Sequence, residues 1–229
     1  MNKILVVAAH PDDEILGCGA TMAKFSEEGN IIHILILGEG ITSRQDIRNS
    51  KASKAEIDKL HLEAKEAAKI VGAKSVEVLK FPDNRFDTIP LLDIIKAVEI
   101  KKQEIKPDIV FTHHAQDLNI DHRKTFQAVL TACRPVKNET VREIFSFEIP
   151  SSTEWQAQTS TSAFLPTQYI VITESHLKAK TEAIEIYTSE VKNYPHPRSS
   201  TALKLLAEWR GINIGARYAE SFEMVRRIL

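Results

Sequence analysis

The residues best suited to chemistry follow the first apolar run of the chain. Ile4 to Glu14 reads ILVVAAHPDDE, in which the apolar run meets one imidazole and three carboxylates without a spacer. An Ile- and Val-rich run that ends at a proline predicts a buried parallel strand, and in open α/β sheets ligands bind at the carboxyl ends of such strands. The carboxylates would repel one another unless a cation lies among them. His10 and Asp13 offer the nitrogen and oxygen ligands that suit a zinc ion.

A purely structural role for these residues is the alternative. Asp12 or Asp13 would cap the following helix, with Glu14 in its first turn, and His10 would be an ordinary loop residue. This stretch alone does not separate the two interpretations. The choice depends on which other residues reach the same edge of the sheet.

Length and composition fit one folded domain. The chain has 229 residues, of which 43% are hydrophobic and 27% charged, enough for a substantial core with an ordinary polar surface. We therefore expect a single domain over residues 1–229, with a core in 1–135 and a C-terminal extension in 136–229.

Net charge and cysteine content limit the expected binding partners and the expected cellular location of the protein. A net charge of −1 gives no broad attraction to nucleic acid or to an anionic membrane. No stretch approaches the ~20 apolar residues of a membrane span. Cys18 and Cys133 are the only cysteines and imply no disulfide framework, so a reducing cytoplasm is the expected location.

Alternating strand and helix patterns organise the chain. They predict strands at 3–9, 31–37, 75–81, 108–112, 142–149 and 167–173, and helices at 14–28, 55–71, 90–106, 122–133, 175–189 and 200–209. The order up to residue 135 predicts an α/β fold with a Rossmann-like, doubly wound, mainly parallel sheet and helices on both faces. In the usual strand order, 3-2-1-4-5, the first and fourth strands are neighbours. The residues after the fourth strand should then face the His-Pro-Asp-Asp-Glu stretch.

The segment after the fourth predicted strand carries a second polar cluster. His113 to Thr125 reads HHAQDLNIDHRKT and contains three histidines. Taken singly, these residues have structural explanations, because Asp121 could cap the next helix and His113 could pack at the strand end. Two such clusters at one predicted edge of the sheet, the second facing His10 and Asp13, instead favour a metal site.

Several segments together resemble a known family. Residues 8–21, AAHPDDEILGCGAT, resemble the first motif of the PIG-L/LmbE-like zinc-dependent N-deacetylases. Residues 117–122, DLNIDH, resemble the second motif, which has the form D-x-[HN]-x-D-H. Residues 195–199, 206–211 and 218–222 resemble C-terminal blocks of that family, so the resemblance runs in order through most of the chain.

The resemblance implies a fold, a cofactor and a reaction. The fold is Rossmann-like, with C-terminal strands and helices over the site, and the reaction removes the N-acetyl group from an amino sugar or its conjugate. By matched position, His10, Asp13 and His122 hold one zinc ion per chain, with another divalent ion as an alternative. Zinc-activated water attacks the amide, and Asp12 acts as general base.

Other polar residues are candidates for supporting roles. Glu14 and Asp121 could orient the ligating imidazoles. His113, His114 and His196 are candidates to hold the oxyanion or to protonate the departing amine. The expected substrate contacts are Arg44, Asp83, His114, Asn119 and Arg198.

Two of the substrate contacts lie in predicted loops. Asp83 belongs to the turn after the third strand, where sugar binding and an ordinary turn are both reasonable readings. Many family members carry an arginine on the second helix where Leu60 stands in this chain. Arg44 or Arg48, in the loop before that helix, could supply the charge instead.

Residues 194–199, YPHPRS, are expected to line the mouth of the active site. Two prolines flank His196 and stiffen its backbone, which suits donors that must meet an oxygen without loss of entropy on binding. We expect His196 to be catalytic and Arg198 to contact substrate, either in their own subunit or in the neighbouring subunit of a homo-oligomer. The alternative is a rigid lead-in to the last helix with both side chains in solvent.

Two other functions are weighed against the N-deacetylase. An S-adenosylmethionine-dependent methyltransferase would use residues 16–19, LGCG, as a cofactor loop, but these glycines fall inside a predicted helix and no G-x-G-x-x-G is present. A non-catalytic zinc-binding protein on the same fold would bind metal without releasing acetate. Both rank below the deacetylase.

Overall fold

One mixed sheet forms the centre of the molecule. The computed structural model describes residues 1–44, 49 and 53–229, and within them the strand order is β3-β2-β1-β4-β5-β7-β6. The strands are β1 (Lys3–Ala8), β2 (Ile31–Gly38), β3 (Ser75–Phe81), β4 (Ile109–His113), β5 (Glu143–Phe147), β6 (Gln168–Val171) and β7 (Ala219–Arg227). The first five are parallel, whereas β7 runs antiparallel to both β5 and β6.

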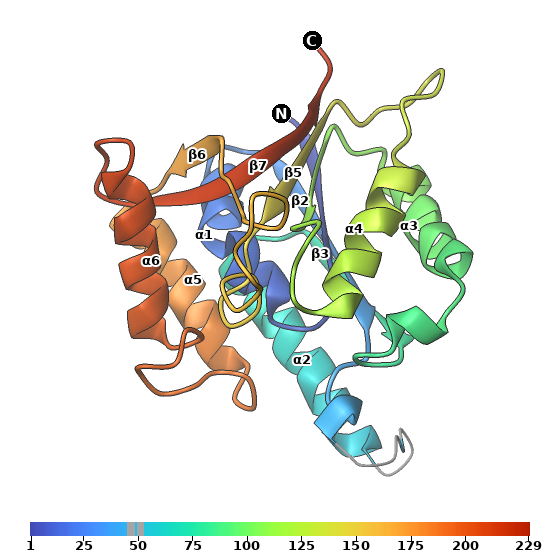
Figure 1. The fold of residues 1–229 in the computed structure, drawn as a ribbon, viewed down its shortest axis with the longest axis horizontal. Coiled ribbons are helices and arrows are strands. Elements are labelled where there is room, and N and C mark those ends of the chain that lie inside the picture. The colour runs from blue at the N-terminus through green and yellow to red at the C-terminus, as the bar shows by residue number, and fades with distance from the viewer. Residues whose placement is uncertain (45–48, 50–52) are drawn as a thin grey trace.

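Helices cover both faces of this sheet (Figure 1). They are α1 (Asp13–Glu27), α2 (Lys54–Ile70), α3 (Leu91–Ile105), α4 (Ile120–Ala132), α5 (Glu174–Ile186) and α6 (Ser200–Ile212). Alternate residues of β1 point to opposite faces, so Val6 packs with α1, α2 and α5 while Val7 packs with α3 and α4. This burial on both faces explains why β1 is a continuous apolar run.

The predicted fold class is confirmed. β1 lies between β2 and β4, with Ile4 beside Ile109, so the carboxyl ends of β1 and β4 meet at the switch point of the sheet. The strand β7 was not predicted. Its sequence, AESFEMVRR, mixes charged residues into the apolar alternation, and only its position between β5 and β6 makes it a strand.

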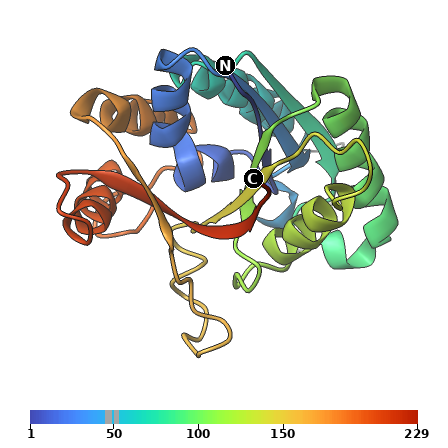
Figure 2. The ribbon, with the colours of Figure 1, turned by 90° about the horizontal axis from the view of Figure 1, so that it is seen from above.

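The C-terminal extension continues the same sheet and helix layer. β7 and β6 extend the sheet beyond β5, and α5 packs against α1 and α2. Figure 2 shows that the segment between β5 and β6 extends away from the sheet. No helix within the described ranges is long and apolar enough to cross a membrane.

Helix α1 is interrupted close to its start. Cys18 has φ −150° and ψ 26°, outside the helical region, so a short turn from Asp13 to Gly17 is separated from the rest of the helix. Gly17 allows this turn to pack closely on β5, because a Cβ atom there would overlap the Phe147 ring. The glycines of this segment therefore serve helix packing and do not form a loop for a cofactor.

Candidate metal centre

The turn between β1 and α1 holds a strained residue. Asp12 has φ 99°, a conformation that residues other than glycine rarely adopt. Its N–H donates to Glu14 Oε2 at 3.1 Å, and Glu14 in turn accepts a hydrogen bond from the Tyr187 hydroxyl. Asp12 occupies the N-cap position of α1 without a side-chain cap hydrogen bond. Its carboxylate is therefore not used for capping, and surrounding contacts maintain the strain, as is common at functional sites.

Three predicted ligands converge at the switch point. His10 Nδ1 lies 3.3 Å and His122 Nε2 lies 3.2 Å from Asp13 Oδ2, and all three ligand atoms lie within 4.8 Å of one another. His122 is in the first turn of α4. That helix is capped by Asn119, whose side chain accepts from the Asp121 N–H at 2.8 Å, so Asp121 itself is not the cap.

Both imidazoles are oriented by a further carboxylate. His10 Nε2 lies 2.9 Å from Asp121 Oδ2, and His122 Nδ1 lies 3.0 Å from Asp117 Oδ1. A carboxylate only accepts, so in the neutral ring each of these nitrogens keeps the hydrogen, and the other nitrogen, which faces Asp13 Oδ2, is the one that would bind a metal in place of a proton. Two neutral imidazoles and one carboxylate, oriented in this way, fit a zinc-type ion.

The electrostatics of the cluster also favour a cation. Burial alone would lower the pKa of His122, but the carboxylates of Asp13 and Asp117 outweigh it and raise that pKa to about 9. Burial acts to raise the pKa of Asp13, but His122 and His10 outweigh it and hold that pKa well below its usual range. The carboxylates of Asp13 and Asp117 thus favour positive charge at this place, either as a proton on the imidazole or as a divalent metal that replaces that proton.

A second set of possible ligands shares His10. Its Nε2 also lies 3.4 Å from Asp83 Oδ1, and His10, Asp83 and Asp121 have ligand atoms within 4.8 Å of one another. A metal in this position would need the nitrogen that donates to Asp121. The set containing Asp13 requires no such exchange and is the better metal site.

A polar cavity of about 160 Å³ opens beside the ligands. It is lined by His10, Pro11, Asp12, Asp13, Gly40, Ile41, Ser43, Leu60, Asp83, Asn84, Asn119, Glu190 and Arg198. Within it, Arg198 Nη1 donates to Asp12 Oδ2 at 2.9 Å, and Arg198 Nε donates to Ser151 Oγ at 2.8 Å. Burial raises the pKa of Asp12 well above its usual range, although the Arg198 guanidinium opposes that rise.

Asp83, Asn119 and Arg198, three of the predicted substrate contacts, all line this cavity, and their role in substrate binding stays a prediction. His114 does not line it, because its ring nitrogens lie 2.8 Å from Glu223 Oε2 and 3.0 Å from the Ser162 carbonyl oxygen. Its role in substrate binding stays a prediction without support from its position.

His196 packs outside the cavity. Its ring packs edge-on against Trp155, and its Nδ1 accepts the Arg198 N–H at 3.1 Å. Its catalytic role also stays a prediction. Arg48 and the Arg44 side chain lie outside the described part of the chain.

Sequence reasoning missed several contributors to the site. Glu190 lines the cavity 3.7 Å from Arg198 Nη1, yet it follows α5 in an irregular segment that carries no motif. Asp117 was noted only as part of the second motif, and its position beside His122 depends on the loop before α4. His113 Nε2 accepts the Ala9 N–H at 2.8 Å, and its ring stacks on that of His122, so it supports the ligand.

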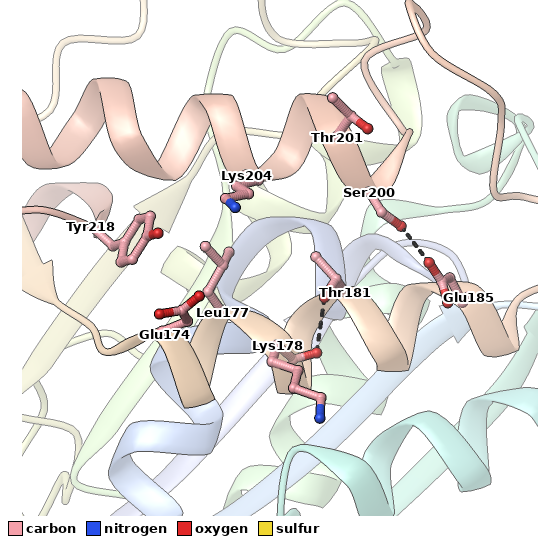
Figure 3. A pocket seen from close by; sticks show the side chains of 9 residues that line it. All are labelled: Glu174, Leu177, Lys178, Thr181, Glu185, Ser200, Thr201, Lys204 and Tyr218. Carbon is pink, nitrogen blue, oxygen red and sulfur yellow. Dashed lines mark hydrogen bonds between the residues drawn. The ribbon is translucent and has the colours of Figure 1, made fainter.

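A larger groove of about 340 Å³ lies between α5 and α6 (Figure 3). Its lining residues are Glu174, Leu177, Lys178, Thr181, Glu185, Ser200, Thr201, Lys204 and Tyr218. None of them is a histidine, a cysteine or an aspartate. The size of this groove therefore does not make it the catalytic centre.

The fold is thus an α/β sheet with a candidate His/Asp metal site at its switch point. The model of the PIG-L family, described as GlcNAc-PI de-N-acetylase, matches residues 5–133. The uncharacterized deacetylase YaiS of Escherichia coli K12 is 32% identical over 191 residues, which cover 81% of this chain and 90% of that protein. The chain belongs to the PIG-L family and is a metal-dependent deacetylase of that family.

Two solved structures show how widely this fold is used. N,N'-diacetylchitobiose deacetylase from Pyrococcus horikoshii superposes with a TM-score of 0.76 at 20% identity, covering 98% of this chain and 84% of that one. GalB, the 4-carboxy-2-hydroxymuconate hydratase from Pseudomonas putida KT2440, also gives a TM-score of 0.76, at 23% identity, covering 100% of this chain and 98% of that one. The fold therefore accommodates different reactions, and the site must decide between them.

Proposed function

We propose that this chain removes the N-acetyl group from an N-acetylated amino sugar or glycoconjugate. His10, Asp13 and His122 would hold one zinc ion, and Asp12 would be the general base. The observation that carries the proposal is the position of Asp12, whose carboxylate lines the cavity beside the ligand set without belonging to it. The description of the family model, a GlcNAc-PI de-N-acetylase, supports an amino sugar as the substrate.

The residues around the cavity have different roles in the proposed hydrolysis. When bound, zinc supplies a Lewis acid that polarises the acetyl carbonyl and lowers the pKa of water. The Asp12 carboxylate takes a proton from the attacking water as the new C–O bond of acetate forms. As the C–N bond breaks, Asp12 returns that proton to the departing amine nitrogen, so one carboxylate serves both proton transfers.

Arg198 would favour the ionised form of Asp12 that a general base needs. Asp12 is buried, and burial favours the neutral acid, which is no base. The Arg198 guanidinium, 2.9 Å from Asp12 Oδ2, opposes this effect and fixes the carboxylate in place. Asp83 and Asn119, which also line the cavity, would offer a carboxylate and an amide group to sugar hydroxyls.

Purified protein should contain about one zinc or similar ion per chain and release acetate from a panel of N-acetylated amino sugars. Asp12→Asn should keep its metal but lose kcat by roughly 10²-fold or more, the scale of a general base. Asp93→Asn, which changes an exposed acid in the first turn of α3, is the control and should keep wild-type activity.

Three outcomes would count against the proposal. Normal turnover by Asp12→Asn removes Asp12 as the base. Loss of metal from the same variant makes Asp12 a ligand. Stoichiometric metal without acetate release from any substrate of the panel favours a non-catalytic zinc-binding protein on this fold.

A further inference from the structure

The break in α1 leaves backbone groups without their helical partners. In a regular helix the Ala20 N–H would donate to the Leu16 carbonyl, one turn earlier. The non-helical conformation of Cys18 disrupts this pairing. Buried backbone groups of this kind need replacement partners, because an unpaired buried group costs about 1–3 kcal/mol.

Two buried side chains from distant parts of the chain replace those partners. Lys180 of α5 donates from Nζ to the Leu16 carbonyl at 2.7 Å, and Glu220 of β7 accepts from the N–H groups of Ala20 at 3.3 Å and Thr21 at 2.6 Å. Lys180 Nζ and Glu220 Oε1 also lie 2.5 Å apart. We call Lys180 and Glu220 the α1 clamp.

The clamp is enclosed by protein. Lys180 is 5% and Glu220 6% exposed, so their charges are almost removed from water and must satisfy one another. A buried ion pair is weak evidence for stability, since apolar residues of the same size often serve as well. Its value lies in fixing the two parts of α1 in one relative orientation.

The short turn held by the clamp carries one metal ligand of the proposed set. Asp13 lies on that turn, whereas His10 follows β1 and His122 belongs to α4. The distance from Asp13 to the two imidazoles therefore depends on how the turn is angled against the sheet. Tyr187, which follows α5, fastens the same turn through its hydrogen bond to Glu14.

We infer that Lys180 and Glu220 are positioning residues for the metal centre. They act from the C-terminal extension by fixing the angle of the turn that carries Asp13. The inference rests on the proposed metal site, but not on the identity of the substrate. It also gives a function to the residue block 218–222, which contributes no ligand and does not line the catalytic cavity.

The matched control is a second lysine–glutamate pair with the same chemistry. Lys102 donates to the Ala132 carbonyl at 2.5 Å and to Glu139, and Glu139 accepts from the N–H groups of Thr140 at 2.9 Å and Val141 at 3.1 Å. This pair joins α3 to the end of α4, and among the residues that the structure describes it makes no hydrogen bond or ion pair with His10, Asp13 or His122. Its removal should cost stability alone.

The experiment compares two double variants that remove both charges at similar volume. Lys180→Met/Glu220→Gln should weaken metal binding by about 10- to 100-fold, the range for residues that orient metal ligands, and should lower kcat with little change in KM. Lys102→Met/Glu139→Gln should lower Tm while its metal Kd stays at the wild-type value. The Kd is measured by zinc competition with a chromophoric chelator.

Equal losses of Tm in the two double variants, with wild-type metal Kd in both, would make the α1 clamp merely structural and overturn the inference. Should Lys180→Met/Glu220→Gln fail to fold, Glu220→Asp decides the question. Its shorter side chain cannot reach both N–H groups and Lys180, so a folded Glu220→Asp protein should bind zinc several-fold more weakly. Wild-type affinity in that variant would overturn the inference. Absence of acetate release by the wild type would refute the proposed function and leave this comparison of Kd values intact.

Discussion

Replacing Asp121 by asparagine tests the geometry of the metal centre most directly. Asp121 faces two donors, since Oδ2 accepts from His10 Nε2 at 2.9 Å and Oδ1 accepts from the Phe86 N–H at 2.9 Å. An asparagine has one carbonyl oxygen and one NH₂ group, so it can accept from only one of them. If it keeps the bond to Phe86, its NH₂ group faces His10 and favours the tautomer with hydrogen on Nδ1.

That tautomer removes the lone pair that His10 presents to the metal. Partners that orient a ligand are worth about 10- to 100-fold in metal affinity, or about 1.4–2.8 kcal/mol. We therefore expect the zinc Kd of Asp121→Asn to rise by that factor at pH 7. The alternative, an unpaired Phe86 N–H, would lower stability by about 1–3 kcal/mol with a smaller effect on metal.

Competition with a chromophoric chelator measures the Kd, and thermal unfolding of the metal-free protein measures stability. Asp83→Asn is the control, because Asp83 is 3.4 Å from the same His10 nitrogen but belongs only to the second ligand set. It should change the zinc Kd by less than about threefold, a shift below 1 kcal/mol. Wild-type affinity and stability in Asp121→Asn would refute the reasoning. A large loss in Asp83→Asn, with Asp13→Asn unaffected, would place the metal in the second set.

Three further outcomes follow from individual contacts. Arg198→Ala should lower kcat/KM by about tenfold or more with unchanged zinc content, and kinetics like the wild type would exclude a role in the reaction. Gly17→Ala should cost about 1–3 kcal/mol in chemical unfolding, because its methyl group overlaps the Phe147 ring, and an unchanged midpoint would contradict this packing. Burial alone would lower the pKa of His114, but Glu223 outweighs it and raises that pKa above its ordinary value near 6.5. The stability that this ion pair contributes should be present at pH 6 and lost as pH rises through the raised pKa of His114. The Tm of His114→Gln should therefore differ from that of the wild type more at pH 6 than at pH 9. An equal Tm difference at both pH values would disprove the pairing.

The sequence carried enough information to predict the fold class and the convergence of the candidate ligands. Buried parallel strands are continuous apolar runs, so β1 and β4 could be located from the sequence pattern alone. The carboxyl ends of neighbouring parallel strands meet at one edge, so the polar residues after β1 and β4 were expected to face one another. His10, Asp13 and His122 do so, with ligand atoms within 4.8 Å of one another.

Contacts from the C-terminal extension could not be predicted in this way. Arg198 was expected at the site mouth, but its partner Asp12 lies 186 positions earlier, and His196, two residues away, turns toward Trp155 instead. Each of these outcomes depends on the path of an irregular segment, and no periodicity encodes that path.

The tertiary structure alone also revealed the α1 clamp. Helix periodicity predicts a continuous α1, and neither Lys180 nor Glu220 stands out among the charged residues of the chain. Their roles arise because α5 and β7 pack beside α1 where its backbone groups lack helical partners. The sequence therefore determines which side chains can bind the metal, through local patterns that set strand ends and helix starts. The angle at which the Asp13 turn meets the imidazoles is set by distant contacts, which exist only once the chain has folded.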